Sequence, residues 1–185
     1  MKRDAQATRQ RIFDAATAEF AQYGIAGARI DRIAAAAGSN KAMIYTYFGS
    51  KDELFDAVGL EQLNRHMNDV PMDANHLPDY AAKVVEHYCQ HPEIMRLVTW
   101  ARLERGPDAG KLTGLLDAYQ RKVEAVAQAQ KEGKVSDRFP AATLLELILC
   151  LIQTNAEPSA EFGDQDEFQR RQQAVKDAVA LLVQV

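Results

Sequence analysis

The stretch "AGSNKAMIYTYFGSK", residues 37–51, combines a tight turn with a short helix. Its Gly-Ser-Asn turn ends on Asn40, a residue well suited to cap the helix expected at 41–48. Within that helix only Ile44 and Phe48 have the apolar character and the four-residue spacing of core positions. The helix therefore leaves a lysine, a methionine and two tyrosines facing outward, which is a large number for so short an element.

Two further helices are expected before this stretch. The first runs from about Asp4 to Tyr23 and stops at a glycine, and the second covers residues 30–37. Their apolar stripes have helical spacing and comprise Ile12, Ala16 and Phe20 in the first helix, and Ile30, Ile33, Ala34 and Ala37 in the second. Two short helices joined by a tight glycine-containing turn form a helix-turn-helix pattern, and the first helix is expected to pack across them.

In a helix-turn-helix unit that binds DNA, the N-terminal residues of the second helix contact base edges, and flanking polar groups contact phosphates. Lys41 can donate to guanine acceptors, and Ala42 or Met43 can contact a thymine methyl group. The groups suited to phosphates are the hydroxyls of Tyr45 and Tyr47 and the ammonium group of Lys51. A plain three-helix bundle, in which the tyrosines only pack, is the structural alternative.

Charge is distributed unevenly along the chain. The 185 residues carry a net charge of −4, but residues 1–51 hold eight Lys and Arg against four Asp and Glu. The remainder is acidic, with a net charge of −8. A basic module on an acidic body is typical of a protein that binds nucleic acid, although such an imbalance also arises by chance.

The composition, 47% hydrophobic and 26% charged, is that of a globular protein. No apolar stretch is long enough for a membrane span, and the N-terminal residues lack the apolar run of a signal peptide. Cys89 and Cys150 lie far apart and in no metal-ligand spacing. We therefore expect reduced thiols in a cytoplasmic protein that has no membrane partner.

The rest of the chain also has helical periodicity, and no strand pattern interrupts it. Further helices are expected at about 51–68, at 111–131 and at 166–183. Between them, one helix is expected to end near His91, the next to run from Pro92 to about 105, and another to start near Pro140 and contain residues 144–152. The helix at 111–131 is expected to bury Leu112, Leu115, Leu116, Tyr119 and Val123. The sequence thus predicts an all-α protein of about nine helices.

Four short motifs occur in fixed order between Thr8 and Val58: "A..EF...G", "IA..AG", "IY.YF" and "SK.EL". In this order and spacing they closely resemble the TetR family of bacterial transcriptional regulators. The resemblance implies a dimer that binds a roughly palindromic DNA operator and is released by a small-molecule effector. It implies a helix-turn-helix domain at 1–51, a ligand-binding and dimerisation domain at 52–185, and a regulator, commonly a repressor, rather than an enzyme.

The resemblance also assigns roles to individual positions of this chain. The family's base-contacting segment falls on Lys41, Ala42 and Met43, and its phosphate-contacting positions fall on Tyr45, Tyr47 and Lys51. The residue that opens the second helix, often Thr in the family, is Arg29 here. This change removes a capping hydroxyl and adds a cation that can contact a phosphate. Ala42 replaces the usual Gly, and Met43 replaces a frequent Thr.

The C-terminal body diverges within the family, although residues 91–106 resemble a segment found in one subgroup. Residues on amphipathic faces that are candidates for an effector pocket are His66, Met67, Tyr88, Met95, Trp100, Tyr119 and Gln153. Ordinary core packing is the competing interpretation for each. Trp100 is the strongest candidate, because a large ring beside a cavity favours apolar or aromatic ligands. The acidity of the body is compatible with a cationic ligand, but a solvated acidic surface explains it more simply.

Dimerisation is indicated by the last two expected helices. The run "LLELILCLI", residues 144–152, is apolar nearly all round and needs covering on more than one side. The last helix repeats Phe168, Val175 and Leu182 every seven residues. Packed against their copies, the two helices would form a four-helix homodimer interface, and a core completed within one chain is the alternative.

The strongest competing feature is the pair His87 and His91, four residues apart with Glu86 and Cys89 nearby. Two histidines at this spacing can share a metal, which would suit a helical metal-binding protein or enzyme. The H-E-x-x-H order and a third ligand are missing, and Pro92 follows at once. With no nucleophile motif or phosphate loop either, we expect no catalytic residue, metal or cofactor. A helical adaptor that binds only proteins would leave the basic N-terminal module unexplained.

Overall fold

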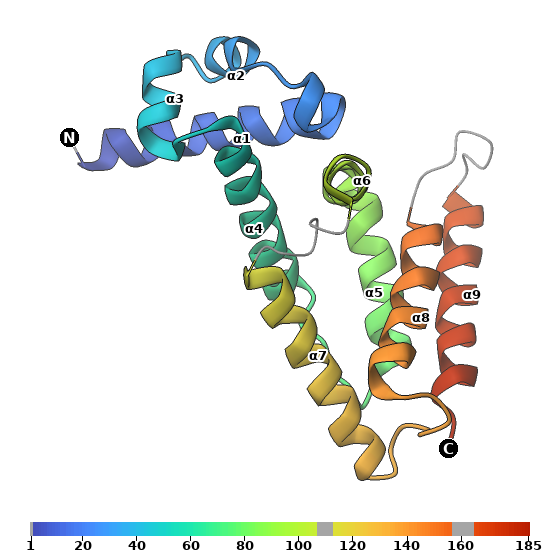
Figure 1. The fold of residues 1–185 in the computed structure, drawn as a ribbon. Coiled ribbons are helices and arrows are strands. Elements are labelled where there is room, and N and C mark those ends of the chain that lie inside the picture. Colours follow the sequence, from blue (N-terminus) through green and yellow to red (C-terminus); the bar gives the residue numbers. More distant parts are fainter. Residues whose placement is uncertain (1, 107–112, 157–164) are drawn as a thin grey trace. The chain divides into compact units, whose positions relative to one another are not determined.

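The computed structural model describes residues 2–106, 113–156 and 165–185 of the chain (Figure 1). Within these ranges the protein consists of nine α-helices and contains no strand. The helices are α1 (Lys2–Gly27), α2 (Ile30–Ala36), α3 (Lys41–Phe48), α4 (Lys51–Asp69), α5 (Leu77–Gln90), α6 (Pro92–Arg105), α7 (Thr113–Lys131), α8 (Ala141–Asn155) and α9 (Gln165–Val183). The all-α prediction is confirmed.

The chain forms two compact units. The first unit comprises Met1–Asn64 together with Arg96–Leu112, and the second comprises Arg65–Met95 together with Thr113–Val185. Most of α6 therefore folds with the N-terminal helices, from which it is distant in sequence. Each unit has a hydrophobic core of its own.

The core of the first unit is built from the predicted stripes of the N-terminal helices. Ile12, Ala16 and Phe20 of α1 are fully buried, and the Phe20 ring meets the Phe55 ring of α4 edge-on at 5.2 Å between centroids. Leu97 of α6 belongs to the same core. The predicted packing of the first helix across the next two is confirmed, and α4 and α6 complete it.

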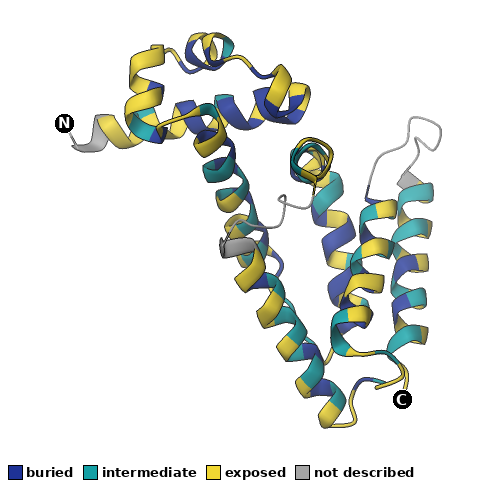
Figure 2. Ribbon diagram, in the orientation of Figure 1, coloured by how far each residue is buried: buried dark blue, intermediate teal, exposed yellow. Residues whose placement is uncertain are grey.

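The second unit packs α5 most extensively against α9, while α8 contacts α5, α7 and α9. Its core lies on one side of α8, where Leu144, Leu145, Ile148 and Ile152 are fully buried. The other side of α8 keeps exposed residues, which include Leu147, at 37% exposed (Figure 2). The described part of the chain thus covers α8 on one side only.

One expectation for α7 is wrong. Leu116, predicted to be buried, is 52% exposed, while Tyr119 and Val123 are half-buried. The side chains at the two other predicted positions, Leu112 and Leu115, lie outside the described residues. The helix buries Ala118, Val126 and Ala129 instead, and these residues follow a neighbouring stripe.

None of the described helices combines the length and the apolar character that crossing a membrane requires.

Candidate nucleic-acid interface

The turn between α2 and α3 is held by backbone hydrogen bonds. The amide of Gly38 donates to the carbonyl of Ala35, and the amide of Ser39 donates to the carbonyl of Ala34. Gly38 itself has φ +57, a left-handed conformation that glycine adopts at little cost. The guanidinium of Arg11 on α1 adds a hydrogen bond of 3.2 Å to the carbonyl of Ala37. The turn therefore closes α2 and sets the direction in which α3 starts.

Helix α3 is anchored at both of its inward positions and capped at its start. The side chain of Asn40 accepts a hydrogen bond of 2.8 Å from the amide of Met43, which confirms the predicted N-cap. Ile44 and Phe48 are buried, as predicted. Since the helix is fixed by these three residues, its outer face is free for another role.

The outer face of α3 carries the side chains predicted to contact bases. Lys41, Ala42 and Met43 are exposed in its first turn (Figure 2). The ammonium group of Lys41 lies 2.6 Å from the Asp31 carboxylate of α2, and both side chains are well exposed. An ion pair exposed to this degree contributes little to stability, so DNA can displace Asp31 at small cost. The assignment of these residues to bases remains a prediction.

The two tyrosines of α3 differ in their surroundings. Tyr45 is exposed, whereas Tyr47 is half-buried, packs against the core and lies edge-on to the Phe48 ring. The Arg9 guanidinium of α1 lies 5.3 Å from the Phe48 ring centroid and is exposed. Arg9 is thus a cation beside α3 that has no signal in the sequence, because only the fold brings α1 next to α3.

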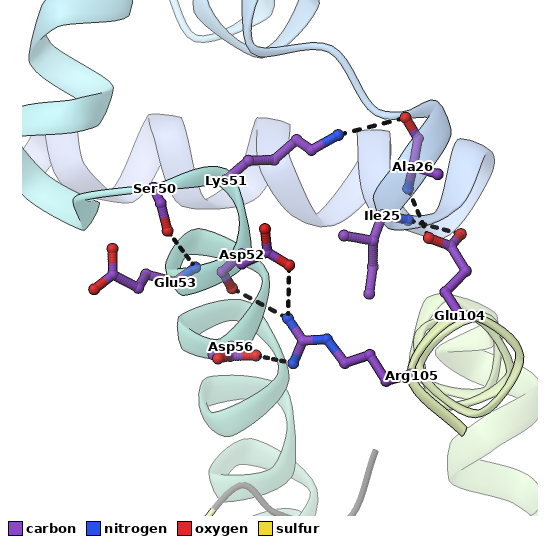
Figure 3. Close-up of polar contacts among 9 residues, drawn as sticks. All are labelled: Ile25, Ala26, Ser50, Lys51, Asp52, Glu53, Asp56, Glu104 and Arg105. Carbon is purple, nitrogen blue, oxygen red and sulfur yellow. Dashed lines mark hydrogen bonds and ion pairs between the residues drawn. The ribbon is translucent and has the colours of Figure 1, made fainter. Parts of the chain in front are cut away.

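Lys51 has partners within the chain. Its ammonium group donates to the carbonyls of Ala26 (3.4 Å) and Ala28 (3.3 Å), at the connection between α1 and α2 (Figure 3). An ammonium group has three donors, so one remains for a phosphate. The structure therefore gives Lys51 a structural role in addition to the predicted phosphate contact.

Arg29 occupies the N-cap of α2 without capping it. Its backbone is extended, its side chain is exposed, and it makes no side-chain cap hydrogen bond, as the loss of the usual hydroxyl led us to expect. Glu19 of α1 takes over part of this role. Its buried carboxylate accepts from the Arg29 amide at 2.8 Å and from the Arg32 guanidinium at 2.7 Å. The start of α2 is thus fixed from α1, and the Arg29 side chain is left free.

A break in α1 is filled by side chains of α6 (Figure 3). Gly24 has φ +71 and ψ −174, so the regular helical hydrogen bonding is interrupted there. The Glu104 carboxylate accepts from the amides of Ile25 (3.0 Å) and Ala26 (2.7 Å), just after the break. Backbone groups that the break leaves without helical partners are therefore satisfied by α6.

Two further side chains of α6 bind the other side of the break. The Arg96 guanidinium (2.7 Å) and the Trp100 indole (3.3 Å) both donate to the carbonyl of Ala21. A β-carbon at Gly24 would come within 2.7 Å of the Trp100 ring, so the glycine also permits a close approach. Trp100, a predicted pocket residue, thus packs on α1 within the first unit.

The last turn of α6 is tied to α4 as well. The Arg105 guanidinium pairs with Asp56, reaches Asp52 at 3.4 Å, and lies 4.9 Å from the centroid of the Phe55 ring (Figure 3). Together with Glu104, this residue connects α6 to both α1 and α4. The helix α1, which packs across the helix-turn-helix, is consequently held by a segment 75 to 79 residues further along the chain.

Among the remaining pocket candidates, the structure brings His66 and Tyr88 together. Their rings stack at 4.9 Å between centroids, and His87 lies 5.0 Å from His66. Tyr119 is half-buried, and its hydroxyl donates to the Glu146 carboxylate at the surface. The other candidates of the second unit are Met67 and Gln153, which are half-buried, and Met95, which is buried.

The electrostatics of the paired rings follow from burial. Burial, helped by the Lys122 ammonium group and by His87, lowers the pKa of His66 to about 3. Burial also lowers the pKa of His87 and raises the pKa of Tyr88 to about 12. At neutral pH both histidines are therefore uncharged, and the tyrosine keeps its proton.

The predicted histidine pair lies at the C-terminal end of α5, with His87 inside the helix and His91 just after it. The rings of His87 and His91 lie 4.7 Å apart and line an open surface pocket of about 410 Å³. Cys89 is engaged elsewhere, since its thiol donates to the carbonyl of Ala156. Within the described ranges no group of three or more His, Cys, Asp or Glu side chains is arranged to hold a metal.

The capped and anchored helix α3, with its exposed first turn and the basic residues around it, defines a helix-turn-helix DNA-binding protein. Comparison with known proteins agrees. The family model described as "Bacterial regulatory proteins, tetR family" matches residues 12–58, and the model described as "Tetracyclin repressor-like, C-terminal domain" matches residues 76–184. The chain belongs to the TetR family of transcriptional regulators.

Individual relatives are similar over much of the chain. The HTH-type transcriptional repressor SCO4008 of Streptomyces coelicolor is 41% identical over 150 residues, which are 80% of this chain and 78% of the relative. The HTH-type transcriptional repressor NicS of Pseudomonas putida is 34% identical over 60% of this chain and 56% of its own length. The crystal structure of SCO4942 from the same Streptomyces species, described as a transcriptional regulator, superimposes with a TM-score of 0.80 at 31% identity. That match covers 96% of this chain and 98% of SCO4942.

Proposed function

We propose that the protein is a transcriptional repressor that binds a palindromic operator as a dimer and is released from it by a small-molecule effector. The observation that carries the proposal is the outer face of α3, which stays exposed although the helix is anchored and capped from within. Its first turn, Lys41 to Met43, would enter the major groove and contact bases. The repressor role is supported by the names of SCO4008 and NicS.

The groups around α3 would hold the DNA backbone. Tyr45, Tyr47, Lys51 and Arg29 are the proposed phosphate contacts, and the exposed Arg9 joins them as a cation beside α3. Residues 1–51 would then form the DNA-binding domain, and residues 52–185 the ligand-binding and dimerisation domain. The contacts of α6 with α1 and α4 would keep the DNA-binding domain in one conformation.

Dimerisation through α8 and α9 is supported by apolar side chains left open on both helices. Leu147 of α8 is 37% exposed and Leu181 of α9 is 68% exposed. Exposed leucines on two neighbouring helices fit an isologous four-helix interface, in which each copy covers the other. A dimer would place two copies of α3 on the two half-sites of a palindrome.

Release by an effector requires that the ligand binds the form with low DNA affinity better than the form with high DNA affinity. A coupling of about 1–3 kcal/mol would change operator affinity by about 5- to 150-fold. The protein would act in the cytoplasm by binding alone, without catalysing a reaction.

The test is selection of bound fragments from a random DNA library, followed by gel-shift titration of the enriched sequence. We expect a palindrome, bound by a dimer, with affinity that falls steeply as salt rises. Tyr47→Phe and Lys51→Ala should weaken binding to all sequences alike, whereas Lys131→Ala, at the exposed C-terminal residue of α7 in the second unit, should leave it unchanged. Failure to enrich any sequence would contradict the proposal. A stoichiometric transition metal in the purified protein would favour the alternative, a metal-binding protein that uses His87 and His91.

A further inference from the structure

The second unit contains a polar cluster between three of its helices, and one member, His87, also lines the surface pocket described above. Its members come from the end of α4, from α5 and from α7, and they are His66, Tyr80, His87, Tyr88 and Lys122. The His66 ring stacks on the Tyr88 ring and lies tilted against the His87 ring, and a hydrogen bond of 2.8 Å connects the Lys122 ammonium group to the Tyr80 hydroxyl. We refer to these five residues as the polar cluster.

Two nitrogen atoms in the polar cluster have no hydrogen-bond partner. His66 is 3% exposed and its Nδ1 is unpaired, and His87 is 8% exposed and its Nε2 is unpaired. A buried polar group without a partner costs about 1–3 kcal/mol, and native proteins rarely leave two of them side by side. The arrangement therefore points to a bound molecule that supplies the missing partners.

The charge of the polar cluster indicates what kind of molecule this is. Lys122 is half-buried, and among the described residues no carboxylate pairs with its ammonium group. Burial lowers the pKa of Lys122, as expected for a cation that lacks a counter-ion. Its contacts are the hydroxyl and the ring face of Tyr80, and that hydroxyl still has its own proton to donate. Hydrogen-bond donors thus outnumber hydrogen-bond acceptors in the polar cluster, and this excess of donors favours an anionic ligand.

The surroundings of Lys122 are apolar, whereas the carboxylates of Asp69 and Glu93 lie on the His87 side of the polar cluster. Val84 lies one helical turn from both Tyr80 and Tyr88 on α5, Val126 lies one turn from Lys122 on α7, and both valines are fully buried. A strongly hydrated inorganic anion loses too much solvation in such a place, whereas an organic acid can place its carboxylate at the ammonium group and its carbon skeleton against the valines.

We propose that the polar cluster binds a small organic carboxylate, with the acid group at Lys122 and Tyr80 and further hydrogen bonds to His66 and His87. This carboxylate is the effector that releases the operator, a role that rests on the function proposed above. The negative charge of the body as a whole would instead suggest a cationic ligand, but that charge lies on the solvated surface, and the polar cluster is cationic.

The proposal is tested by calorimetric titration of the full-length protein with acids and their uncharged counterparts. The probes are benzoate, phenylacetate, cinnamate and hexanoate, each paired with its primary amide, and sodium phosphate serves as the inorganic arm. We expect saturable binding of at least one carboxylate and binding at least tenfold weaker for its amide and for phosphate. Lys122→Met removes the charge and keeps the length of the side chain. It should weaken the carboxylate by about 10- to 100-fold, as expected for loss of a hydrogen bond to a charged group.

Two variants control this experiment. Lys131→Met removes an exposed lysine from the same helix and should leave carboxylate affinity unchanged. Tyr80→Phe keeps the ring, removes the hydroxyl and should weaken the carboxylate several-fold, which provides a second readout if Lys122→Met folds poorly. The proposal is overturned if none of the four carboxylates binds, if amides or phosphate bind as well as the acids, or if both Lys122→Met and Tyr80→Phe retain wild-type affinity.

Gel shifts with the selected operator separate this proposal from the proposed function. If the operator is bound and a neutral or cationic compound releases it while the carboxylates do not bind, the repressor function stands and the carboxylate site is wrong. If a carboxylate binds through Lys122 but no DNA is bound, the site stands and the repressor function is wrong. Release of the operator by the bound carboxylate, lost in Lys122→Met, would support both.

Discussion

Replacing Gly24 by alanine tests the break in α1 and the role of α6 beside it. Gly24 combines φ +71 with ψ −174, a backbone region that only glycine occupies readily, so alanine there costs about 1–3 kcal/mol. The added β-carbon would also come within 2.7 Å of the Trp100 ring and closer still to the Glu104 carboxylate. Displacing these side chains adds about 1–3 kcal/mol. We therefore expect Gly24→Ala to destabilise the first unit by about 2–6 kcal/mol.

Gly38→Ala is the matched control for this prediction. Gly38 also has positive φ, at +57, but a β-carbon there would meet no atom within 4 Å. Alanine at this position should cost only the left-handed backbone term, about 1–2 kcal/mol. Urea unfolding followed by fluorescence of Trp100, the single tryptophan, reports on the first unit directly. Equal destabilisation by the two substitutions would refute the close approach of α6 to the break.

Two further predictions concern the second unit. The folded protein keeps His66 neutral, with its pKa lowered from 6.5 to about 3, whereas the unfolded chain binds a proton below pH 6.5. Stability is therefore complete above pH 6.5 and is lost as the pH falls toward 3. Between pH 7 and pH 5 the free energy of unfolding falls by about 2 kcal/mol because of this group. His66→Gln should therefore flatten the dependence of the free energy of unfolding on pH in this range. An unchanged pH dependence would contradict a buried, neutral His66. Leu147→Glu should shift the dimer toward monomer in sedimentation equilibrium. Leu103→Glu, at an exposed leucine of α6, is the control and should leave the dimer unchanged. A Leu147→Glu variant that remains fully dimeric would exclude α8 from the interface.

The local features of the first unit could be predicted from the sequence because they depend on short-range spacing. The cap at Asn40 and the inward positions Ile44 and Phe48 follow from residue type and helical periodicity, and all three are confirmed. The residues assigned to bases stand on the exposed side of the helix for the same reason. Their contacts with DNA remain predictions.

The long-range features had no local signal. The contact of Glu104 with Ile25 joins residues 79 positions apart, and helical periodicity in the sequence does not predict such a contact. Trp100 has the size of a pocket residue, but its place depends on the break at Gly24. The polar cluster likewise depends on three helices meeting, and the amphipathic faces of the sequence indicate His66 and Tyr88 only as separate residues.

The burial of α7 was mispredicted for a related reason. Leu116 fits an apolar stripe, but a helix can present either of two neighbouring stripes to its partner, and packing against α8 decides between them. The structure buries the stripe with Ala118 and Val126. Small residues there allow close packing, which a preference for large apolar side chains overlooks.

The central claim, that the first turn of α3 contacts bases, is tested most directly by one binding profile. The affinity of wild-type protein and of Lys41→Ala is measured by fluorescence anisotropy for the selected operator and for a set in which each base pair is replaced in turn. We expect Lys41→Ala to lose discrimination at one symmetric pair of positions, by about 1–3 kcal/mol, and to keep it elsewhere. Equal loss of affinity at every operator variant would show that Lys41 contacts only the DNA backbone, and would contradict base contact by the first turn of α3.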